Sequence, residues 1–367
     1  MLAKLLSQMD GARFENHVTA LMPGGGLWQE IEPMCASLTS LGLNSPVQAP
    51  KAVLALCRQI RKLQPDIVQT WLYHGDLAGG IAAKLSGVPA IWNIRCSNVN
   101  IRNYGLASRA VLAVLPYLSR LPVAAISNST AGQISHEAIG YRPKRWVLIP
   151  NGFDTERFRP DRSAGVQVRQ ELGLAADAFV VGMVARYDPQ KDHETFLRAA
   201  KLHAEDHPGS RFVLVGRGLA GESSPVRASI NACGLQGKVL LLEERTDIPR
   251  ILQAFDVFSL TSDSGEGFPN VVGEAMSCGV PCVVTDVGDA AKIVKETGRV
   301  VPPTQPTALA NAWTELAQMD RSRLQELGEA ARQRIVENFT LPDIVARFER
   351  LYEEAVGGTV PVSASNR

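Results

Sequence analysis

The chain has 367 residues, of which 45% are hydrophobic and 20% are charged, and its formal net charge at pH 7 is +1. That length is long for one hydrophobic core and natural for two domains. No apolar run approaches the roughly 18 residues of a membrane-spanning helix, and the N-terminus lacks the charged-then-apolar pattern of a signal peptide. The composition argues against an integral membrane protein, and we expect a globular protein of the cytoplasm.

The small net charge conceals an asymmetry between the two halves of the chain. Residues 1–150 hold 14 Lys and Arg against 7 Asp and Glu, whereas the remainder holds 24 against 30. A basic first half suits an anionic partner, such as an acidic membrane surface or a phosphorylated acceptor, although a mixed solvated surface is equally compatible. We expect no nucleic-acid partner.

The first half alternates short β-branched runs with amphipathic or Ala-rich segments. The expected strands are 17–22, 66–72, 90–95, 123–127 and 146–150. This spacing is typical of βαβ units, and it therefore predicts a parallel sheet.

A helical segment before the fourth of these strands carries regularly spaced arginines. Arg102, Arg109 and Arg120 fall on one side of an ideal helix, because spacings of 7 and 11 residues are close to whole turns. Apolar residues occur in the same segment: Leu106, Val111, Leu112, Leu115 and Leu118. Pro116 interrupts the helix, so the alignment is approximate. Two interpretations remain open, an amphipathic surface that binds a membrane and a core helix with an arginine rim.

Residues 151–165 are rich in charge and contain Pro160 and Gly165, which indicates a linker. Beyond it, the expected strands are 179–185, 211–215, 238–242, 257–260 and 281–285, each followed by a helical pattern. Three further helical patterns cover 307–319, 322–339 and 342–356, and small polar residues from 357 to 367 indicate a disordered tail.

This order of elements predicts an α/β fold with two doubly wound, Rossmann-like domains, at 1–150 and 166–340. Ligands of such sheets bind beyond the carboxyl ends of the strands, so we expect the site in a cleft between the domains.

The six cysteines give no sign of disulfides or metal. They are scattered over predicted helices and strands, at Cys35, Cys57, Cys96, Cys233, Cys278 and Cys282. That distribution fits free buried thiols. Cys278 and Cys282 form one close pair, but one ends a predicted helix, the other opens a strand, and no second pair lies nearby.

The segment 262–281 carries the clearest chemical signal. Glu266 lies on a glycine-flanked loop after a strand, and Pro269 is preset for the start of a helix. The free N–H groups of that helix suit a phosphate. Glu274 follows five residues later, roughly 7 Å along the axis, where a carboxylate accepts hydrogen bonds from a vicinal diol. The segment therefore suits a diphosphate joined to a ribose; a surface helix with two solvated acids is the alternative.

Two Glu separated by seven residues resemble the motif of retaining glycosyltransferases of family 4. Four other segments are similar to motifs of that family: PDIVQTWLYHGDLAGGIAAKLSGVP (65–89), VLIPNGFDTERFRP (147–160), GMVARYDPQKDHETFLRAA (182–200) and RVVPP (299–303). The resemblance covers roughly residues 15–355. It implies the GT-B fold, with an acceptor domain at 1–150, a nucleotide-sugar domain at 166–340 and a helix at 341–356 that crosses back to the first domain.

The first domain departs from this pattern at its beginning. Members of the family open with a strand and a Gly-rich turn before their first helix, whereas here Met1 already falls inside what resembles that helix. The absent strand is central in the doubly wound order, so its loss would leave backbone unpaired in the sheet. A start codon upstream of Met1 and a damaged domain are the alternatives, and we favour the former.

Positive side chains at a strand end provide the donor-site chemistry. Arg186 and Lys191 both follow the strand 179–185, where they can neutralise a diphosphate. The chain contains no Asp-x-Asp, the common carboxylate cradle for a divalent ion, so we expect neither a metal nor another cofactor. The resemblance implies that these two cations stabilise the departing diphosphate, that Glu266 contacts the donor sugar and that Glu274 holds the ribose.

The resemblance also implies supporting residues on both sides of the site. On the donor side these are Gly216, Gly267, Phe268 and Asn270, the backbone N–H groups of Gly267 and Phe268 completing the phosphate site. On the acceptor side they are His74, Arg95, Ser127 and Asn128. His74 ends an expected strand and would meet the transferred sugar, although a lone, partly buried histidine is as often structural as functional.

A rival motif favours a different enzyme class. Gly216, Gly218 and Gly221 match the dinucleotide fingerprint, and Glu243 stands near the distance expected for a ribose-binding acid. That pattern indicates an NAD(P)-dependent oxidoreductase, but it follows the second strand of its domain, not the first. A protein that binds a nucleotide sugar without transferring it is a third possibility.

We predict a retaining, metal-independent glycosyltransferase. Its donor would be a nucleotide-diphosphate sugar and its acceptor a hydroxyl of a glycan or glycolipid, in the synthesis of lipid-linked or surface polysaccharide. The basic first domain would hold it peripherally on the cytoplasmic membrane face.

Overall fold

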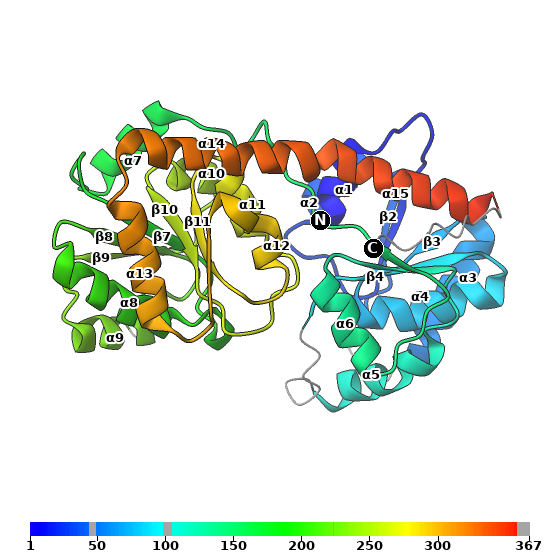
Figure 1. Cartoon of the computed structure of the whole chain (residues 1–367). Helices are drawn as coiled ribbons and strands as arrows, with labels where there is room; N and C mark the ends of the chain where they lie inside the picture. The colour runs from blue at the N-terminus through cyan, green and yellow to red at the C-terminus, as the bar shows by residue number, and fades with distance from the viewer. Residues whose placement is uncertain (44–48, 98–104, 223, 358–367) are drawn as a thin grey trace. The chain divides into compact units, whose positions relative to one another are not determined.

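The structure is a computed structural model that describes residues 1–43, 49–97, 105–222 and 224–357. It divides into two compact units: unit 1 comprises Met1–Gly152 and Leu341–Arg367, and unit 2 comprises Phe153–Thr340. Each unit has parallel strands with helices on both faces (Figure 1). The predicted α/β class with parallel sheets is confirmed.

Unit 2 contains one unbroken sheet of six strands in the order β12-β11-β10-β7-β8-β9, with every neighbouring pair parallel. Its strands are β7 (Val180–Val184), β8 (Arg211–Val215), β9 (Val239–Leu242), β10 (Val257–Leu260), β11 (Cys282–Thr285) and β12 (Arg299–Val301). The four central strands are apolar runs buried on both faces, as parallel sheets require. The order reverses between β7 and β10, so the chain leaves these two adjacent strands in opposite directions at their carboxyl ends.

The helices of unit 2 cover both faces of this sheet (Figure 1). They are α7 (Arg162–Glu171), α8 (His193–Asp206), α9 (Pro225–Cys233), α10 (Ile248–Leu252), α11 (Asn270–Ser277), α12 (Ala290–Val294), α13 (Pro306–Ala317) and α14 (Arg321–Asn338), with short 3₁₀ turns η4 (Pro189–Lys191) and η5 (Lys295–Thr297).

Unit 1 contains two separate parallel sheets. One pairs β1 (His17–Ala20) with β2 (Ser37–Ser40), and the other has the order β3-β4-β5-β6. The strands of the second sheet are β3 (Val68–Gln69), β4 (Ala90–Ile94), β5 (Ala124–Ser127) and β6 (Trp146–Leu148). Among the described residues no backbone hydrogen bond joins the two sheets, and the break lies where the sequence predicts an absent strand. Helix α1 (Leu2–Gln8) bridges the break, because Leu5 packs in the larger core and Leu6 in the smaller.

The four-stranded sheet of unit 1 is covered differently on its two faces. Helices α1 and α15 (Leu341–Val356) pack on the face formed by Ile91 and Ile126. The opposite face, with Trp92 and Ala125, packs against α4 (Leu72–Ser86), α5 (Leu106–Leu118) and the Tyr141 that follows α6 (Thr130–Ala138). The remaining elements are α2 (Trp28–Ile31), η1 (Glu32–Met34) and α3 (Ala49–Leu63).

The unit boundary differs from the predicted linker at 151–165. The chain enters unit 2 between Gly152 and Phe153, and both Phe153 and Phe158 are buried in the core of unit 2. Helix α7 begins at Arg162, where the Asp161 side chain accepts a hydrogen bond from the Ala164 N–H. The charged composition of this stretch concealed its two buried aromatic anchors. The predicted tail lies outside the described residues, except for Gly357.

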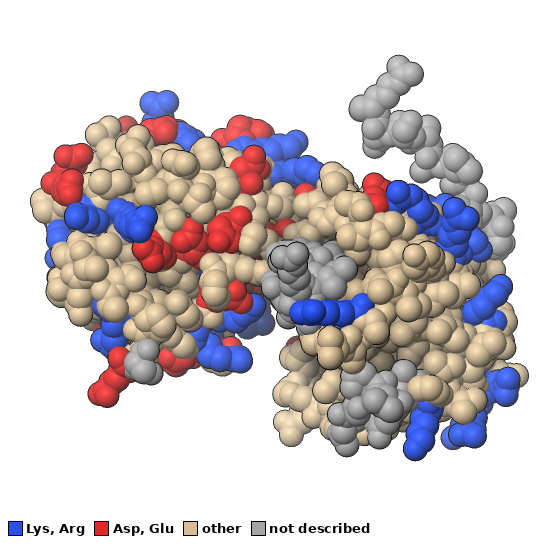
Figure 2. Space-filling view, turned by 90° about the horizontal axis from the view of Figure 1, so that it is seen from below, with Lys and Arg blue, Asp and Glu red and all other residues tan. Residues whose placement is uncertain are grey.

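No helix in the described part of the chain is long and apolar enough to cross a membrane. Charge is distributed unevenly between the units. On the face shown in Figure 2, the charged side chains of unit 1 are nearly all Lys and Arg, whereas unit 2 displays both signs.

Candidate active site

A buried polar cluster lies in unit 2, at the carboxyl ends of β7 and β10. The loop after β10 places Glu266 so that only 8% of its surface is exposed. One carboxylate oxygen of Glu266 accepts a hydrogen bond from the Ser262 hydroxyl at 2.6 Å and also forms an ion pair with the Lys191 ammonium. The structure therefore brings together the acid of one strand end and the cation of its neighbour.

Backbone contacts fix the two loops against each other. The Thr261 hydroxyl donates to the carbonyl oxygens of Lys191 (2.9 Å) and Asp192 (3.1 Å). The Asp263 N–H donates to the carbonyl oxygen of Gln190. The relative positions of Lys191 and Glu266 are thus held by the fold as well as by their own ion pair.

Arg186 reaches the same strand edge but is largely exposed. Its guanidinium pairs with the Asp188 carboxylate at 2.6 Å. Burial alone would raise the pKa of Asp188, but hydrogen bonds from the Gln190 N–H and Arg186 outweigh it and lower that pKa. Arg186 is therefore oriented by a carboxylate that stays ionised at neutral pH.

The helix that follows Glu266 begins at Asn270, with Pro269 as its N-cap residue and no side chain capping it. Gly267 and Phe268 are buried immediately before it, and Glu274 lies one turn inside the helix, half-buried. The predicted donor-binding residues of this segment are thus brought to one loop and helix N-terminus.

Gly216 belongs to this edge for a steric reason. A Cβ atom at Gly216 would lie 2.0 Å from the Ala185 carbonyl oxygen, next to Arg186. Only glycine permits the end of β8 to approach the end of β7 so closely.

The glycine loop after β8 does not have the geometry of a dinucleotide fingerprint. The Glu243 carboxylate accepts hydrogen bonds from the N–H groups of Gly218 (2.8 Å) and Ala220 (3.3 Å), so both of its oxygens are used within the loop. The next helix starts at Pro225, four residues after the third glycine. The oxidoreductase alternative is not favoured.

Unit 1 holds a second polar cluster at the carboxyl ends of β4, β5 and β6. The Arg95 guanidinium donates to the Asn151 side-chain oxygen, which also lies 3.5 Å from the Asn128 side-chain nitrogen. Arg95 stacks over the Trp71 ring, and burial lowers its pKa to about 10, so it remains a cation at neutral pH. Sequence reasoning assigned no role to Asn151 or Trp71, although both lie inside quoted motif segments.

His74 and Ser127, two predicted acceptor-side residues, lie in positions that differ from those expected. His74 does not end a strand: β3 covers only two residues and α4 begins at Leu72, so His74 lies in the first turn of that helix. It is exposed, with its Nε2 atom 3.4 Å from the Ser108 hydroxyl. Ser127 is fully buried and donates to the Ser129 carbonyl oxygen, so it supports the start of α6 and is not presented to a ligand.

The predicted row of arginines is not formed on α5. Arg109 lies on the helix, Arg120 follows its end, and Arg102 lies outside the described residues. Val111, Leu112 and Leu115 are buried in the core. Of the apolar residues expected here, Leu106 is exposed, at 83%, and Val114 (44%) and Tyr117 (87%) are exposed on the same helix.

No group of three or more His, Cys, Asp or Glu side chains able to hold a metal ion occurs among the described residues. All six cysteines are free thiols.

Comparisons with known proteins agree on one family. The family model "Glycosyltransferase Family 4" matches residues 2–157, and "Glycosyl transferases group 1" matches residues 167–334. The chain is 30% identical to the UDP-Gal:alpha-D-GlcNAc-diphosphoundecaprenol alpha-1,3-galactosyltransferase of Escherichia coli, over 85% of this chain and 81% of that enzyme.

Solved structures show the same fold. The Anabaena protein HepE, solved in complex with UDP and glucose, superposes with a TM-score of 0.82 at 23% identity, over 96% of this chain and 95% of that one. Sucrose-phosphate synthase of Thermosynechococcus elongatus gives 0.80 at 21% identity, over 98% and 92%. These are two-domain GT-B proteins, and the chain belongs to glycosyltransferase family 4.

Proposed function

We propose that this glycosyltransferase transfers a sugar from a nucleotide-diphosphate donor to an acceptor hydroxyl, with retention of anomeric configuration and without a metal ion. The observation that carries the proposal is the Lys191–Glu266 pair at the switch point of the unit 2 sheet. A cation and a carboxylate fixed side by side suit a leaving diphosphate and the positive charge that develops on the sugar.

Each donor-site residue has a role in this proposal. Arg186 and Lys191 stabilise the departing diphosphate, and Glu266 contacts the donor sugar. Glu274 accepts hydrogen bonds from the ribose, while Gly267, Phe268 and Asn270 offer the N-terminus of α11 to a phosphate. Because Lys191 forms an ion pair with Glu266, donor binding requires Lys191 to share its charge with the incoming diphosphate.

The reaction breaks the bond between the anomeric carbon and the diphosphate oxygen. The acceptor hydroxyl attacks on the face that the diphosphate vacates, and a diphosphate oxygen takes the hydroxyl proton. The products are the glycosylated acceptor and a nucleoside diphosphate. In this proposal the Arg186 and Lys191 side chains take the place of a metal ion beside the leaving diphosphate.

For the substrates we propose a UDP-sugar and a lipid-linked glycan acceptor. The E. coli relative is described as acting on UDP-Gal and a diphosphoundecaprenol acceptor, and HepE was solved with UDP and glucose. The Arg95–Asn151–Asn128 cluster is the candidate acceptor contact in unit 1, and His74 in the first turn of α4 is a further candidate.

We further propose that unit 1 contacts an anionic membrane through α5. Exposed Leu106, Val114 and Tyr117 supply the apolar contact, and Arg109 and Arg120 supply positive charge nearby. The test is sedimentation with vesicles that contain acidic phospholipid. Replacing Leu106 and Tyr117 by Ser should release the protein, whereas Leu85→Ser, at an exposed position on α4, should not.

The enzymatic proposal is tested by thermal unfolding and transfer assays with a panel of nucleotide sugars. A ligand that binds only the folded protein raises its melting temperature, and UDP-sugars should do so while NAD and NADP should not. Transfer to a lipid-diphosphate glycan, or slow hydrolysis of the donor, should follow. Binding without either reaction would instead favour a protein that only binds nucleotide sugars.

A further inference from the structure

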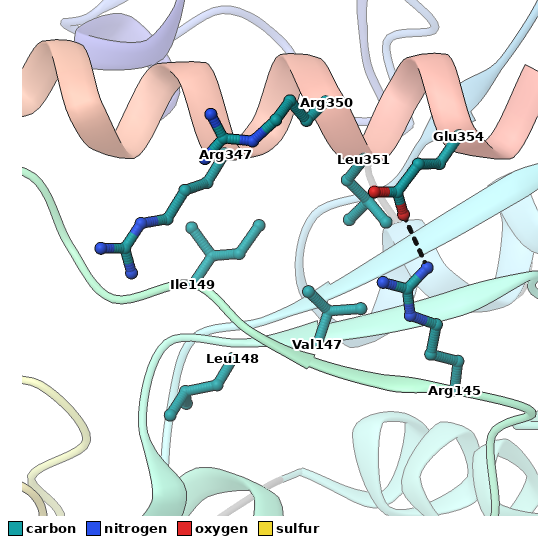
Figure 3. A pocket seen from close by; sticks show the side chains of 8 residues that line it. All are labelled: Arg145, Val147, Leu148, Ile149, Arg347, Arg350, Leu351 and Glu354. Atoms are coloured by element: carbon teal, nitrogen blue, oxygen red, sulfur yellow. Dashed lines mark hydrogen bonds and ion pairs between the residues drawn. The ribbon is translucent and has the colours of Figure 1, made fainter. Parts of the chain in front are cut away.

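A small groove in unit 1 lies outside the regions proposed above for the reaction and the membrane contact. It runs between α15 and the segment around β6, with a volume of about 150 Å³ (Figure 3). Its lining residues are Arg145, Val147, Leu148, Ile149, Arg347, Arg350, Leu351 and Glu354. We call it the α15–β6 groove.

Helical spacing explains why α15 lines the groove with charge. Arg350 and Leu351 lie three and four positions after Arg347, and Glu354 lies three positions after Leu351, so these residues share one face of the helix. Leu351 is buried on that face, while Arg347 and Arg350 reach out along the groove, as Figure 3 shows.

The positive charge of the groove is only partly compensated. Arg145 pairs with Glu354 at 2.8 Å, with both side chains about one third exposed or less. Within the described part of the chain, Arg347 and Arg350 make no hydrogen bond or ion pair. The lining of the groove therefore holds three guanidinium groups and one carboxylate, and the excess positive charge favours an anion.

The volume of the groove and its guanidinium N–H donors indicate which anion it can bind. Guanidinium groups bind phosphate through paired N–H donors, and two of them are available here. The volume of about 150 Å³ is below the roughly 300–1,000 Å³ of sites that enclose a drug-sized ligand. The groove therefore suits one phosphate group, with the rest of its ligand outside.

We propose that the α15–β6 groove binds the phosphate group of a soluble ligand. Helix α15 covers one face of the four-stranded sheet, and α5 covers the other. A membrane that contacts α5 lies on the face of the sheet opposite to α15, and this favours a soluble source of the phosphate. The choice of a soluble ligand over a lipid headgroup rests on the proposed membrane contact of α5. The proposal that the groove binds phosphate does not depend on that contact.

The experiment titrates inorganic phosphate into the full-length protein by calorimetry at low ionic strength. The double variant Arg347→Gln/Arg350→Gln should bind phosphate about 10-fold more weakly or worse, because two charge-assisted donors are lost. The matched control is Arg58→Gln/Arg61→Gln, which removes two exposed arginines at the same spacing from α3 and should change nothing.

A variant that should bind phosphate more tightly shows that a loss of binding in the arginine variant does not come from misfolding. Glu354→Gln frees Arg145 and removes the one carboxylate among the described lining residues, so it should tighten phosphate binding. Phosphate binding that neither Arg347/Arg350 nor Glu354 affects would contradict the proposal, wherever else the phosphate binds.

Sedimentation with vesicles separates the two sources of phosphate. The Arg347→Gln/Arg350→Gln variant should sediment with acidic phospholipid vesicles as well as the wild type. If this variant loses vesicle binding while free phosphate binds to neither protein, the groove holds a lipid headgroup and the soluble-ligand proposal is wrong. Because these assays use neither donor nor acceptor, their failure leaves the proposed transfer reaction untouched.

Discussion

The Lys191–Glu266 pair of unit 2 and His74 of unit 1 differ in how many contacts hold them in place. In unit 2 an unbroken six-stranded sheet carries Glu266 and Lys191 on adjacent strand ends, and buried hydrogen bonds fix both loops. In unit 1 the sheet is split, and His74 stands exposed on a first helical turn with one long contact. We therefore propose that the Lys191–Glu266 site is preorganised, whereas His74 can still adapt its position to a ligand.

The largest effect is expected at Lys191. Lys191→Ala should reduce kcat at least about 100-fold, the scale for losing one preorganised electrostatic group. Lys201→Ala, at an exposed position on α8, is the control and should be neutral. Steady-state kinetics with saturating donor measures this directly. A decrease in kcat of less than about fivefold would contradict a preorganised site in unit 2.

The close approach of β7 and β8 provides a stability test. Gly216→Ala places a Cβ atom against the Ala185 carbonyl oxygen, so the free energy of unfolding should fall by about 1–3 kcal/mol or more. Gly221→Ala adds a methyl group with no atom within 4 Å and should change it little. Urea unfolding compares the two. Equal effects would show that the strand ends separate easily.

A buried carboxyl gives unit 1 a distinct pH dependence. Burial raises the pKa of Asp76 to about 8, outweighing a hydrogen bond from the Thr70 hydroxyl. The unfolded value is about 3.9, so the folded state holds the extra proton between about pH 4 and pH 8 and loses stability as pH rises through that window. The Asp76→Asn variant has no carboxyl to ionise, so its free energy of unfolding should fall much less over the same pH range.

This pH dependence is measurable because four of the five tryptophans, Trp28, Trp71, Trp92 and Trp146, belong to unit 1. Tryptophan fluorescence during urea unfolding at several pH values therefore reports mainly on that unit. Identical pH slopes for the wild type and Asp76→Asn would contradict a protonated Asp76.

The smallest effect is expected at His74. An exposed residue with one contact of 3.4 Å contributes about as much as a single hydrogen bond, so His74→Ala should lower kcat/KM for the acceptor roughly 2- to 10-fold. The KM for the donor should stay unchanged. A loss as large as that at Lys191 would show that unit 1 is as preorganised as unit 2.

The positions of Arg186, Lys191 and Glu266 at strand ends could be predicted from the sequence because the signals for them are local; their roles stay predictions. Arg186, Lys191 and Glu266 each follow an apolar run, and parallel strands deliver their carboxyl ends to one edge. The resemblance to a family then linked the segments in order. Nothing in that reasoning required knowledge of side-chain contacts.

Other features depend on tertiary packing and could not be predicted. The strands β2 and β12 are short and only partly buried, so they lack an apolar run. Helix α4 begins at Leu72, whose φ is 65°. A leucine in the sequence does not predict a positive φ, so this start of the helix could not be foreseen. Phe153 and Phe158 are buried only because unit 2 surrounds them, and the interaction between Arg95 and Asn151 joins residues 56 positions apart.

We propose that this glycosyltransferase transfers its sugar with retention and without a metal ion, and the anomeric configuration of the product tests that proposal most directly. The assay would use an α-linked UDP-sugar and a lipid-diphosphate glycan acceptor in excess EDTA, with the product analysed by proton NMR. We predict an α-linked product formed at the rate seen without EDTA. A β-linked product, or activity that disappears with EDTA and returns with magnesium or manganese, would contradict the account.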